Sequence, residues 1–268
     1  KEQWSAEQSE CFALLANNLE GAVRANVGRF LFLSTIEVYG TPKQTADEST
    51  AARPVTRKGL WMYQAEEMVE TYSKNHGLAT AILRLGQVFC GDIFMESGDC
   101  LARIKEMIEQ EETILNDNLH PIHVNDVTEA IVRLIQNEAV GIYNVCGSKA
   151  VQRGEVARLI VKSEEMVQEP KIQEAECRIN VGNHKLKKAT GWKDVWSVEE
   201  FLTQGKIKFT STQKVDITKK FRLGLGGKTR SFLENIILLA VFAALFFLTG
   251  TTVAFAKWAW VLLYVVVV

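Results

Sequence analysis

The sequence of 268 residues predicts an α/β protein in which helices cover both faces of a doubly wound parallel sheet, with a transmembrane helix near the carboxyl end. Three observations lead to this expectation. Continuous apolar runs of strand length recur along the chain, as in parallel strands that are buried on both faces. The segments between them carry apolar residues three and four positions apart, which is typical of amphipathic helices. One uncharged run is long enough to cross a bilayer.

The first half of the chain alternates helix and strand in this manner. The expected elements are a helix over 6–25, a strand over 30–35, a loop over 41–54, a helix over 59–75 and a strand over 79–89. The first strand, FLFLST, is apolar until it ends in small hydroxyl residues. The second helix ends just before Gly77, a residue type that favours helix termination.

The second half continues the alternation. The expected elements are a helix over 101–111, a short strand and a helix within 121–137, a strand over 141–147, and helices over 154–163 and 198–204. Asn125 or Asp126 is expected to open the helix within 121–137, because both residue types cap helices well. Parallel strands need crossover helices, and the spacing allows them. Residues 1–204 therefore form one predicted domain.

The carboxyl end has a different composition. Residues 205–231 read as a polar, basic linker, and residues 232–268 as a transmembrane and interfacial segment. Ile236–Ala256 contains 21 residues without a charge, and at about 1.5 Å per residue a helix of this length spans the roughly 30 Å hydrocarbon core. A buried core helix is the alternative. The sequence allows three placements for residues 257–268. They extend the helix, lie in the membrane interface, or form the return arm of a hairpin.

The charge and the cysteine content restrict the partners and the cellular compartment that we expect for this chain. The formal net charge is −1, so the chain lacks the basic excess expected of a nucleic-acid partner. Five cysteines are scattered without a CxxC pair, which favours free thiols in a reducing compartment. Cationic residues before the apolar run predict that the large domain lies on the cytosolic, matrix or stromal side of its membrane.

Five segments in order resemble one enzyme family. They read GRFLFLSTIEVYG (28–40), AEEMVETYSKNHGLATAILRLGQVFCGD (65–92), HPIHVNDVTEAIVRLIQ (120–136), GIYNVCGSKAVQRGEVARLI (141–160) and KLKKATGWKDVWSVEEFL (185–202). They resemble the extended short-chain dehydrogenase/reductases (SDR), the NAD-dependent epimerases and dehydratases. The resemblance implies a Rossmann-like, SDR-type sheet with a small substrate lobe.

One departure from the family concerns the dinucleotide fingerprint. The family's G-x-G-x-x-G, in which glycines let the backbone approach a pyrophosphate, is absent. The glycine-rich run at 224–230 follows no expected strand and reads as a hinge. We therefore expect an N-terminal part of the fold to be missing from this sequence or supplied by another chain. Without it, four apolar residues should be poorly covered: Leu31, Leu33, Ile82 and Leu85.

A second departure concerns the catalytic pair. The resemblance implies a tyrosine that exchanges a proton with the substrate, and a lysine four residues later that lowers its pKa and holds the nicotinamide ribose. One alignment register places Lys58 at the tyrosine position and Met62 at the lysine position. The other starts from Tyr63 and places Glu67 at the lysine position. The first register keeps the family spacing to neighbouring motifs, and neither provides a working pair.

Further candidates follow from the resemblance. Ser34 matches the family's serine or threonine that binds substrate, and it is also a weak candidate for cofactor binding. Gly86, Gln87 and Val88 lie where the family's chain passes the nicotinamide, so the implied cofactor is NAD(P), or none if the site has been lost.

Two other groups of residues have simpler explanations. His120, His123 and Asp126 suggest a metal site, but the family uses the last two for packing and capping, which we favour. Cys146 is expected to be a packed apolar residue rather than a nucleophile.

Structural residues match the family while catalytic residues do not. The sequence therefore favours a non-catalytic SDR-like accessory subunit of a membrane complex, for example an organellar respiratory complex such as that of the mitochondrion. Its expected partners are the lipid bilayer and other subunits, at an organellar inner membrane. One alternative is a membrane-anchored NAD(P)-dependent epimerase or dehydrogenase acting on a nucleotide sugar or sterol. Another is an NAD(P)-sensing regulator.

Overall fold

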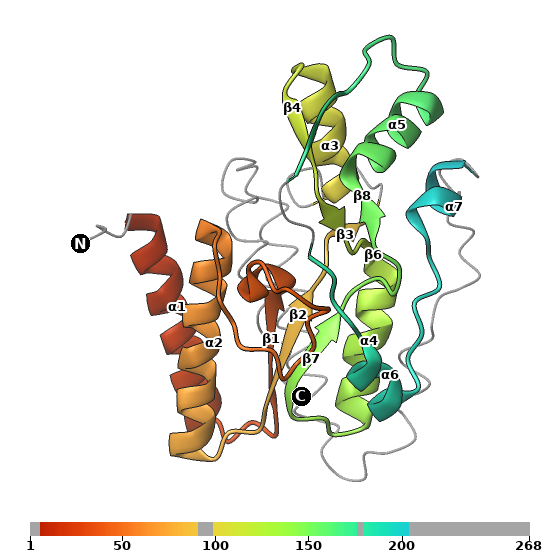
Figure 1. Ribbon diagram of the computed structural model, residues 1–268. Helices are drawn as coiled ribbons and strands as arrows, with labels where there is room; N and C mark the ends of the chain where they lie inside the picture. The colour runs from red at the N-terminus through yellow and green to blue at the C-terminus, as the bar shows by residue number, and fades with distance from the viewer. Residues whose placement is uncertain (1–5, 91–98, 176–178, 204–268) are drawn as a thin grey trace, which may run out of the picture. The chain divides into compact units, whose positions relative to one another are not determined.

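The computed structural model describes residues 6–90, 99–175 and 179–203. Its central sheet contains three parallel strands in the order β1-β2-β7. These strands are β1 (Phe30–Thr35), β2 (Thr80–Leu85) and β7 (Gly141–Val145). Figure 1 shows helices on both sides of these strands, which confirms the expected doubly wound α/β arrangement.

One face of the sheet is covered by α1 (Ala6–Arg24) and α2 (Arg57–His76). Leu19 of α1 and Val69 of α2 are fully buried against the side chains that alternate toward this face, including Phe32 and Ile82. Because β1 and β2 each contain at least three consecutive apolar residues, each strand also supplies apolar side chains to the opposite face.

The opposite face is covered by α4 (Val124–Gln136) and α6 (His184–Thr190). Leu134 of α4, Leu186 of α6 and the fully buried Trp192 pack there against Leu31 and other strand residues. The Trp192 indole N–H donates to the Asp126 carbonyl oxygen at 2.9 Å, which satisfies its polar atom.

A smaller lobe adjoins the carboxyl ends of the strands. It contains the helices α3 (Cys100–Glu109), α5 (Arg153–Ser163) and α7 (Val198–Thr203) around a separate apolar core. Short strand pairs complete it: β4 (Thr113–Asn116) with β9 (Lys171–Glu174), β5 (Asn118–Leu119) with β8 (Val151–Gln152), and β3 (Val88–Phe89) with β6 (Ile122–His123).

Several local expectations need correction. The single strand expected over 79–89 is divided into β2 and β3 at Gly86 and Gln87. Helix α4 is capped by His123, whose Nδ1 accepts from the Asn125 backbone N–H at 3.2 Å, and not by Asn125 or Asp126. The helix is therefore capped two or three positions earlier than the preferences of Asn and Asp suggest.

The expected poor coverage of the strands is also only partly observed. Leu31 and Ile82 are buried, contrary to expectation, because helices from both faces reach them. Leu33 and Leu85 are partly buried. The predicted linker (205–231) and the predicted transmembrane segment (232–268) lie outside the described residues. Within the described ranges, no helix is long and apolar enough to cross a membrane.

Candidate functional site

Ser34 lies near the carboxyl end of β1 and is only 5% exposed. Its hydroxyl donates to Oε1 of Glu66 on α2 at 2.5 Å. The same carboxylate is paired with Arg84 of β2, with Nη2 2.6 Å from Oε2. Charged pairs in the interior need this degree of hydrogen bonding to offset the loss of hydration. The Ser34 hydroxyl thus belongs to an internal network that joins a helix to two strands.

The network continues across the sheet through Arg84. Its guanidinium carbon lies 4.7 Å from the ring centre of Tyr39, a cation–π contact. The Tyr39 hydroxyl donates to Asn144 Oδ1 of β7 at 2.7 Å. Burial raises the pKa of Tyr39, so the phenol stays protonated at neutral pH. Burial opposes the charge on Arg84, but the hydrogen bonds and charge of Glu66 raise its pKa overall.

Lys58 and Met62, the preferred equivalents of the family's tyrosine and lysine, lie on the first turns of α2. Lys58 is exposed, and its Nζ lies 2.8 Å from Glu37 Oε1. Thr56 donates to the other carboxylate oxygen of Glu37 at 2.8 Å. Met62 packs against two of the apolar clusters that surround β1 and the following turn. This register therefore contains an ion-paired amine and an apolar thioether.

The alternative register places Tyr63 and Glu67 one turn apart on α2. Tyr63 is partly buried, and its hydrogen bond to Glu67, together with burial and the charge of Glu67, raises its pKa. A phenol whose pKa is raised is a poorer proton donor at neutral pH, and its phenolate form is scarcer. The glutamate thus has the opposite effect to the lysine of the family pattern.

The segment Gly86–Val88 is fixed by contacts within the chain. A Cβ on Gly86 would lie 2.1 Å from the His120 carbonyl oxygen, so only glycine fits there. The Gln87 side chain accepts from the His120 backbone N–H at 2.7 Å. Val88 packs partly buried against the core beneath α4. These contacts hold the segment between β2 and β3 against the segment that precedes β6.

His120, His123 and Asp126 have separate roles. His123 caps α4 and stacks on Trp196 with ring centres 4.7 Å apart. The Asp126 carboxylate accepts from the backbone N–H groups of Val195 and Trp196, both at 3.1 Å. His123 thus caps a helix and packs against an aromatic ring, whereas Asp126 holds the segment before α7 and caps no helix. Within the described residues, no group of three or more His, Cys, Asp or Glu is arranged to hold a metal ion.

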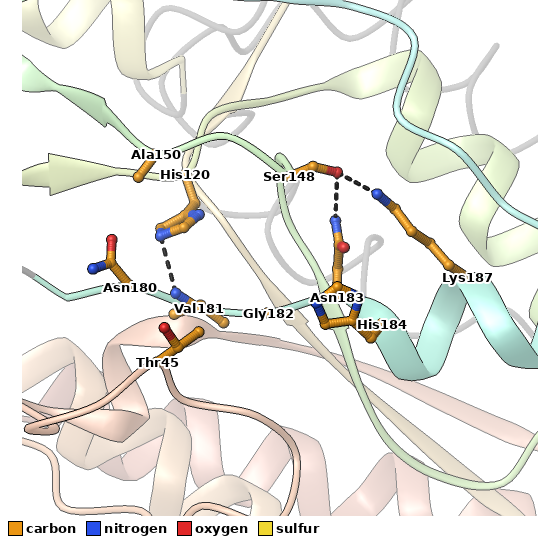
Figure 2. A pocket seen from close by; sticks show the side chains of 10 residues that line it. All are labelled: Thr45, His120, Ser148, Ala150, Asn180, Val181, Gly182, Asn183, His184 and Lys187. Carbon is orange, nitrogen blue, oxygen red and sulfur yellow. Dashed lines mark hydrogen bonds between the residues drawn. The ribbon is translucent and has the colours of Figure 1, made fainter.

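A pocket of about 270 Å³ lies beyond the carboxyl end of β7 (Figure 2). Its walls include Thr45, Ser148, residues 180–184 and Lys187, with His120 beside them. The His120 ring is fixed between the Gly147 carbonyl oxygen, 3.1 Å from Nδ1, and the Val181 N–H, 3.0 Å from Nε2. Burial lowers the pKa of His120, so the ring is neutral.

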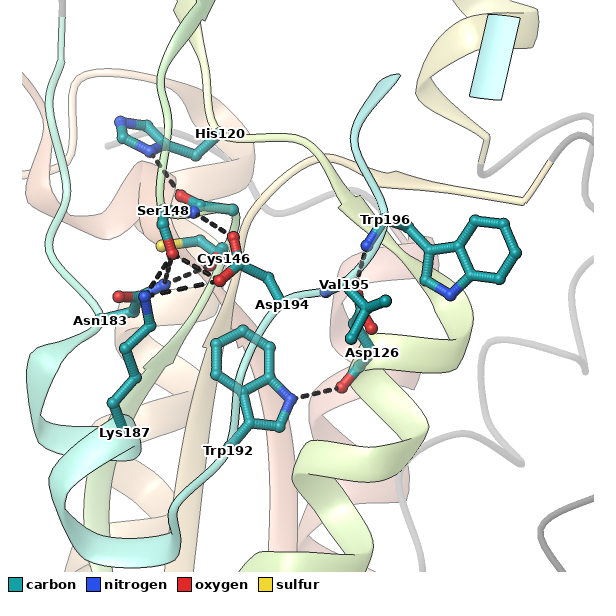
Figure 3. Close-up of polar contacts among 11 residues, drawn as sticks. His120, Asp126, Cys146, Ser148, Asn183, Lys187, Trp192, Asp194, Val195 and Trp196 are labelled. Carbon is teal, nitrogen blue, oxygen red and sulfur yellow. Dashed lines mark hydrogen bonds and ion pairs between the residues drawn. The ribbon is translucent and has the colours of Figure 1, made fainter. Parts of the chain in front are cut away.

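Ser148 is the centre of a polar cluster next to this pocket (Figure 3). Its hydroxyl donates to Asp194 Oδ1 at 2.6 Å and accepts from Lys187 Nζ at 2.5 Å. Asn183 Nδ2 bridges the same hydroxyl, at 3.1 Å, and the Cys146 carbonyl oxygen, at 2.8 Å. Cys146 itself is buried, as expected for a packed residue. Sequence reasoning missed this cluster because its members form no local motif.

Comparison with known proteins identifies the family and the fold. The model of the NAD dependent epimerase/dehydratase family matches residues 6–146. No curated protein matches the chain. A UDP-glucose 4-epimerase from Thermotoga maritima, solved with UDP-glucose, is similar with a TM-score of 0.58 and 21% identity over 69% of this chain and 64% of that one.

Two further solved structures resemble the chain. One is the Thermus thermophilus UDP-glucose 4-epimerase in complex with NAD, with a TM-score of 0.57, 24% identity and coverage of 69% of this chain and 65% of that one. The other is a Bacillus cereus UDP-glucuronic acid 4-epimerase in complex with NAD, with a TM-score of 0.62, 15% identity and coverage of 75% and 68%. The chain thus spans about two thirds of the length of these proteins.

Proposed function

The chain belongs to the NAD-dependent epimerase/dehydratase family, and we propose that it is a non-catalytic member that serves as an accessory subunit of a membrane protein complex. Fold alone does not decide function, so the proposal depends on the residues at the expected site. Those residues keep the internal contacts of the fold, and in neither register does a tyrosine have a lysine four residues later.

The observation that carries the proposal is the environment of Lys58 and Met62. Proton transfer to a sugar hydroxyl requires a group whose pKa is close to the working pH, and a neighbouring cation normally achieves this for tyrosine. Here Glu37 pairs with Lys58 at 2.8 Å, and Met62 contributes only apolar contacts. Tyr63 is next to an acid that raises its pKa.

The described residues also differ from those that the resemblance implies at the nicotinamide end of a dinucleotide. The Ser34 hydroxyl donates to Glu66, and the Gln87 side chain accepts from a backbone N–H. Met62 has no donor for a ribose hydroxyl. The proposed function therefore does not depend on NAD(P), and it is compatible with NAD(P) binding of the kind described for the similar structures, which are complexes with NAD.

The membrane part of the proposal is supported by the uncharged run Ile236–Ala256 and the basic segment before it. The cationic residues that precede the uncharged run would place this domain in the cytosol, matrix or stroma.

The full chain, purified in mild detergent, tests this proposal. UDP-glucose and UDP-glucuronate are incubated with the protein and NAD, and the epimers are separated by chromatography. We expect no conversion above that of heat-inactivated protein, and migration on native gels as part of an assembly much larger than the chain itself. Conversion that is abolished by Tyr63→Phe would overturn the proposal in favour of a membrane-anchored epimerase.

A further inference from the structure

The pocket beyond β7 is separate from the positions that correspond to the family's catalytic pair. Thr45 reaches it from the loop after β1, Ser148 from the turn after β7, and Lys187 from α6 (Figure 2). In parallel α/β sheets, ligands bind outside the carboxyl ends of the strands. The pocket lies at such an end, two strands away from Ser34 in the sheet order β1-β2-β7.

Backbone contacts fix the walls of this pocket. Ala46 donates to the Asn180 carbonyl oxygen at 2.8 Å, and its own carbonyl oxygen accepts from Gly182 at 2.8 Å. A Cβ on Gly147 would lie 2.2 Å from the Pro121 carbonyl oxygen, so the chains approach closely there. A cavity with fixed walls needs little ordering when a ligand enters, which favours binding.

The charge of the lining favours an anion. Lys187 supplies a positive charge to the lining, and no Asp or Glu is among the lining residues. The nearby Asp194 uses both carboxylate oxygens on Ser148, at 2.6 Å to the hydroxyl and 2.8 Å to the backbone N–H. It also lies 3.4 Å from Lys187, so it orients the ammonium group without lining the cavity.

Several donors surround the same space. The Asn180 Oδ1 accepts from Asn118 Nδ2 at 2.9 Å, which leaves the Asn180 amide hydrogens for a ligand. Thr45 adds a hydroxyl, and the Lys187 ammonium has three hydrogens. A phosphate group offers three strong acceptor oxygens, whereas a carboxylate offers two. The number and spread of these donors therefore fit a phosphate better than a carboxylate.

Size restricts the ligand further. A volume of about 270 Å³ corresponds to roughly nine water molecules at about 30 Å³ each. It is slightly below the approximately 300–1,000 Å³ of pockets that hold drug-sized molecules. A phosphate ester with a few carbon atoms fits this space, and a dinucleotide does not.

We propose that this pocket binds a compact phosphate-bearing anion, with Lys187 and Asn180 as its main contacts. The proposal does not depend on the absence of catalysis, because it concerns a different part of the sheet edge. In this proposal the cluster of Ser148, Asn183 and Asp194 has a positioning role. It holds the Lys187 ammonium group where it contacts the anion.

Calorimetric titration of the full chain in detergent with inorganic phosphate, at constant ionic strength, tests this site. We expect saturable binding to one site. Lys187→Gln should weaken the affinity at least tenfold, which corresponds to about 1.4 kcal/mol. Lys188→Gln is the matched control, because it removes the same charge from an exposed position of α6 that is not part of the lining, and it should change the affinity less than twofold.

A second variant separates binding from folding, since Lys187 also contacts Ser148 and Asp194. Asn180→Asp keeps an acceptor for Asn118 and adds a negative charge to the lining, so it should abolish phosphate binding and leave the thermal unfolding curve unchanged. Absence of saturable binding of inorganic phosphate would overturn the proposal. Equal losses from Lys187→Gln and Lys188→Gln, or acetate binding as tightly as phosphate, would do so as well.

A competition experiment shows whether the phosphate group belongs to a soluble ester or to a lipid headgroup. Glycerol 3-phosphate represents a soluble ester, and the short-chain lipid dihexanoyl phosphatidate represents a lipid headgroup. Both carry the proposed chemistry, and whichever displaces inorganic phosphate at the lower concentration identifies the source.

Discussion

At the scale of single residues, the buried carboxylate of Glu66 joins one helix to two strands. It is 2% exposed and accepts from Ser34 and from the guanidinium of Arg84, which is 3% exposed. One side chain thus holds α2 against β1 and β2. The Ser34 hydroxyl therefore has a structural contact that is independent of any substrate.

Replacing Glu66 with Gln tests this role. The amide has nearly the same shape but leaves the Arg84 charge buried without its counter-ion, so we expect a loss of about 3–5 kcal/mol in the free energy of unfolding. Urea denaturation followed by circular dichroism measures it. Glu70→Gln, on the same helix, breaks an exposed pair with Lys74 and should cost less than about 0.5 kcal/mol. Similar losses in the two variants would contradict the argument.

At the scale of elements, the long periodic segments could be predicted from sequence and the short ones could not. β1 and α2 were predicted because each carries its own apolar pattern over many residues. β4 and β9 contain four residues each and pair Thr113 with Lys171 across a long stretch of chain, so tertiary packing determines them. Such strands have too few residues for a periodic signal.

The need for a local sequence signal also decides which functional positions could be predicted: the family's catalytic positions or the pocket beyond β7. Two registers for the family's catalytic residues could be proposed from sequence because the family motif is local. The pocket could not, since Lys187 and Asp194 lie 39 and 46 residues from Ser148 and are joined to it only by the fold. The cap of α4 was missed for another reason: histidine is not among the residue types that usually cap helices, and its buried ring does so here.

The start of α2 gives a prediction at this scale. Thr56 caps the helix by accepting from the Gly59 N–H at 3.0 Å, and it also donates to Glu37. Thr56→Ala should lower the free energy of unfolding by about 1 kcal/mol, and Thr56→Ser should restore it, because serine caps equally well. Urea denaturation of both variants measures this change.

The matched control for that experiment lies on the same helix. Thr71 is exposed in α2, where its hydroxyl donates to the Glu67 carbonyl oxygen. Thr71→Ala should leave stability unchanged or raise it by up to about 0.5 kcal/mol, since alanine favours helix. If Thr56→Ala were as stable as Thr71→Ala, the capping role would be disproved.

At the scale of the whole molecule, the described domain and the carboxyl-terminal segment contrast in chemical character. Apolar clusters cover both faces of the central sheet and fill the smaller lobe, so the described residues contain packed cores of their own. Ile236–Ala256 is apolar without interruption by charge, as expected of a segment whose surroundings are lipid. The proposed accessory role combines the two, with the domain positioned at a membrane surface.

Charge placed in the middle of that segment tests the arrangement. Phe246 and Phe247 lie at the centre of the uncharged run, where each arginine costs about 2.5–3.5 kcal/mol in the bilayer. We expect the unmodified chain to stay with membranes during alkaline carbonate extraction, and the double variant Phe246→Arg, Phe247→Arg to be released. Trp258→Arg is the control, because an arginine near the end of the run reaches the interface by snorkelling and should not release the chain. Release of the unmodified chain, or equal release of the control, would rule out a membrane-spanning segment and leave the domain to be recruited by protein contacts alone.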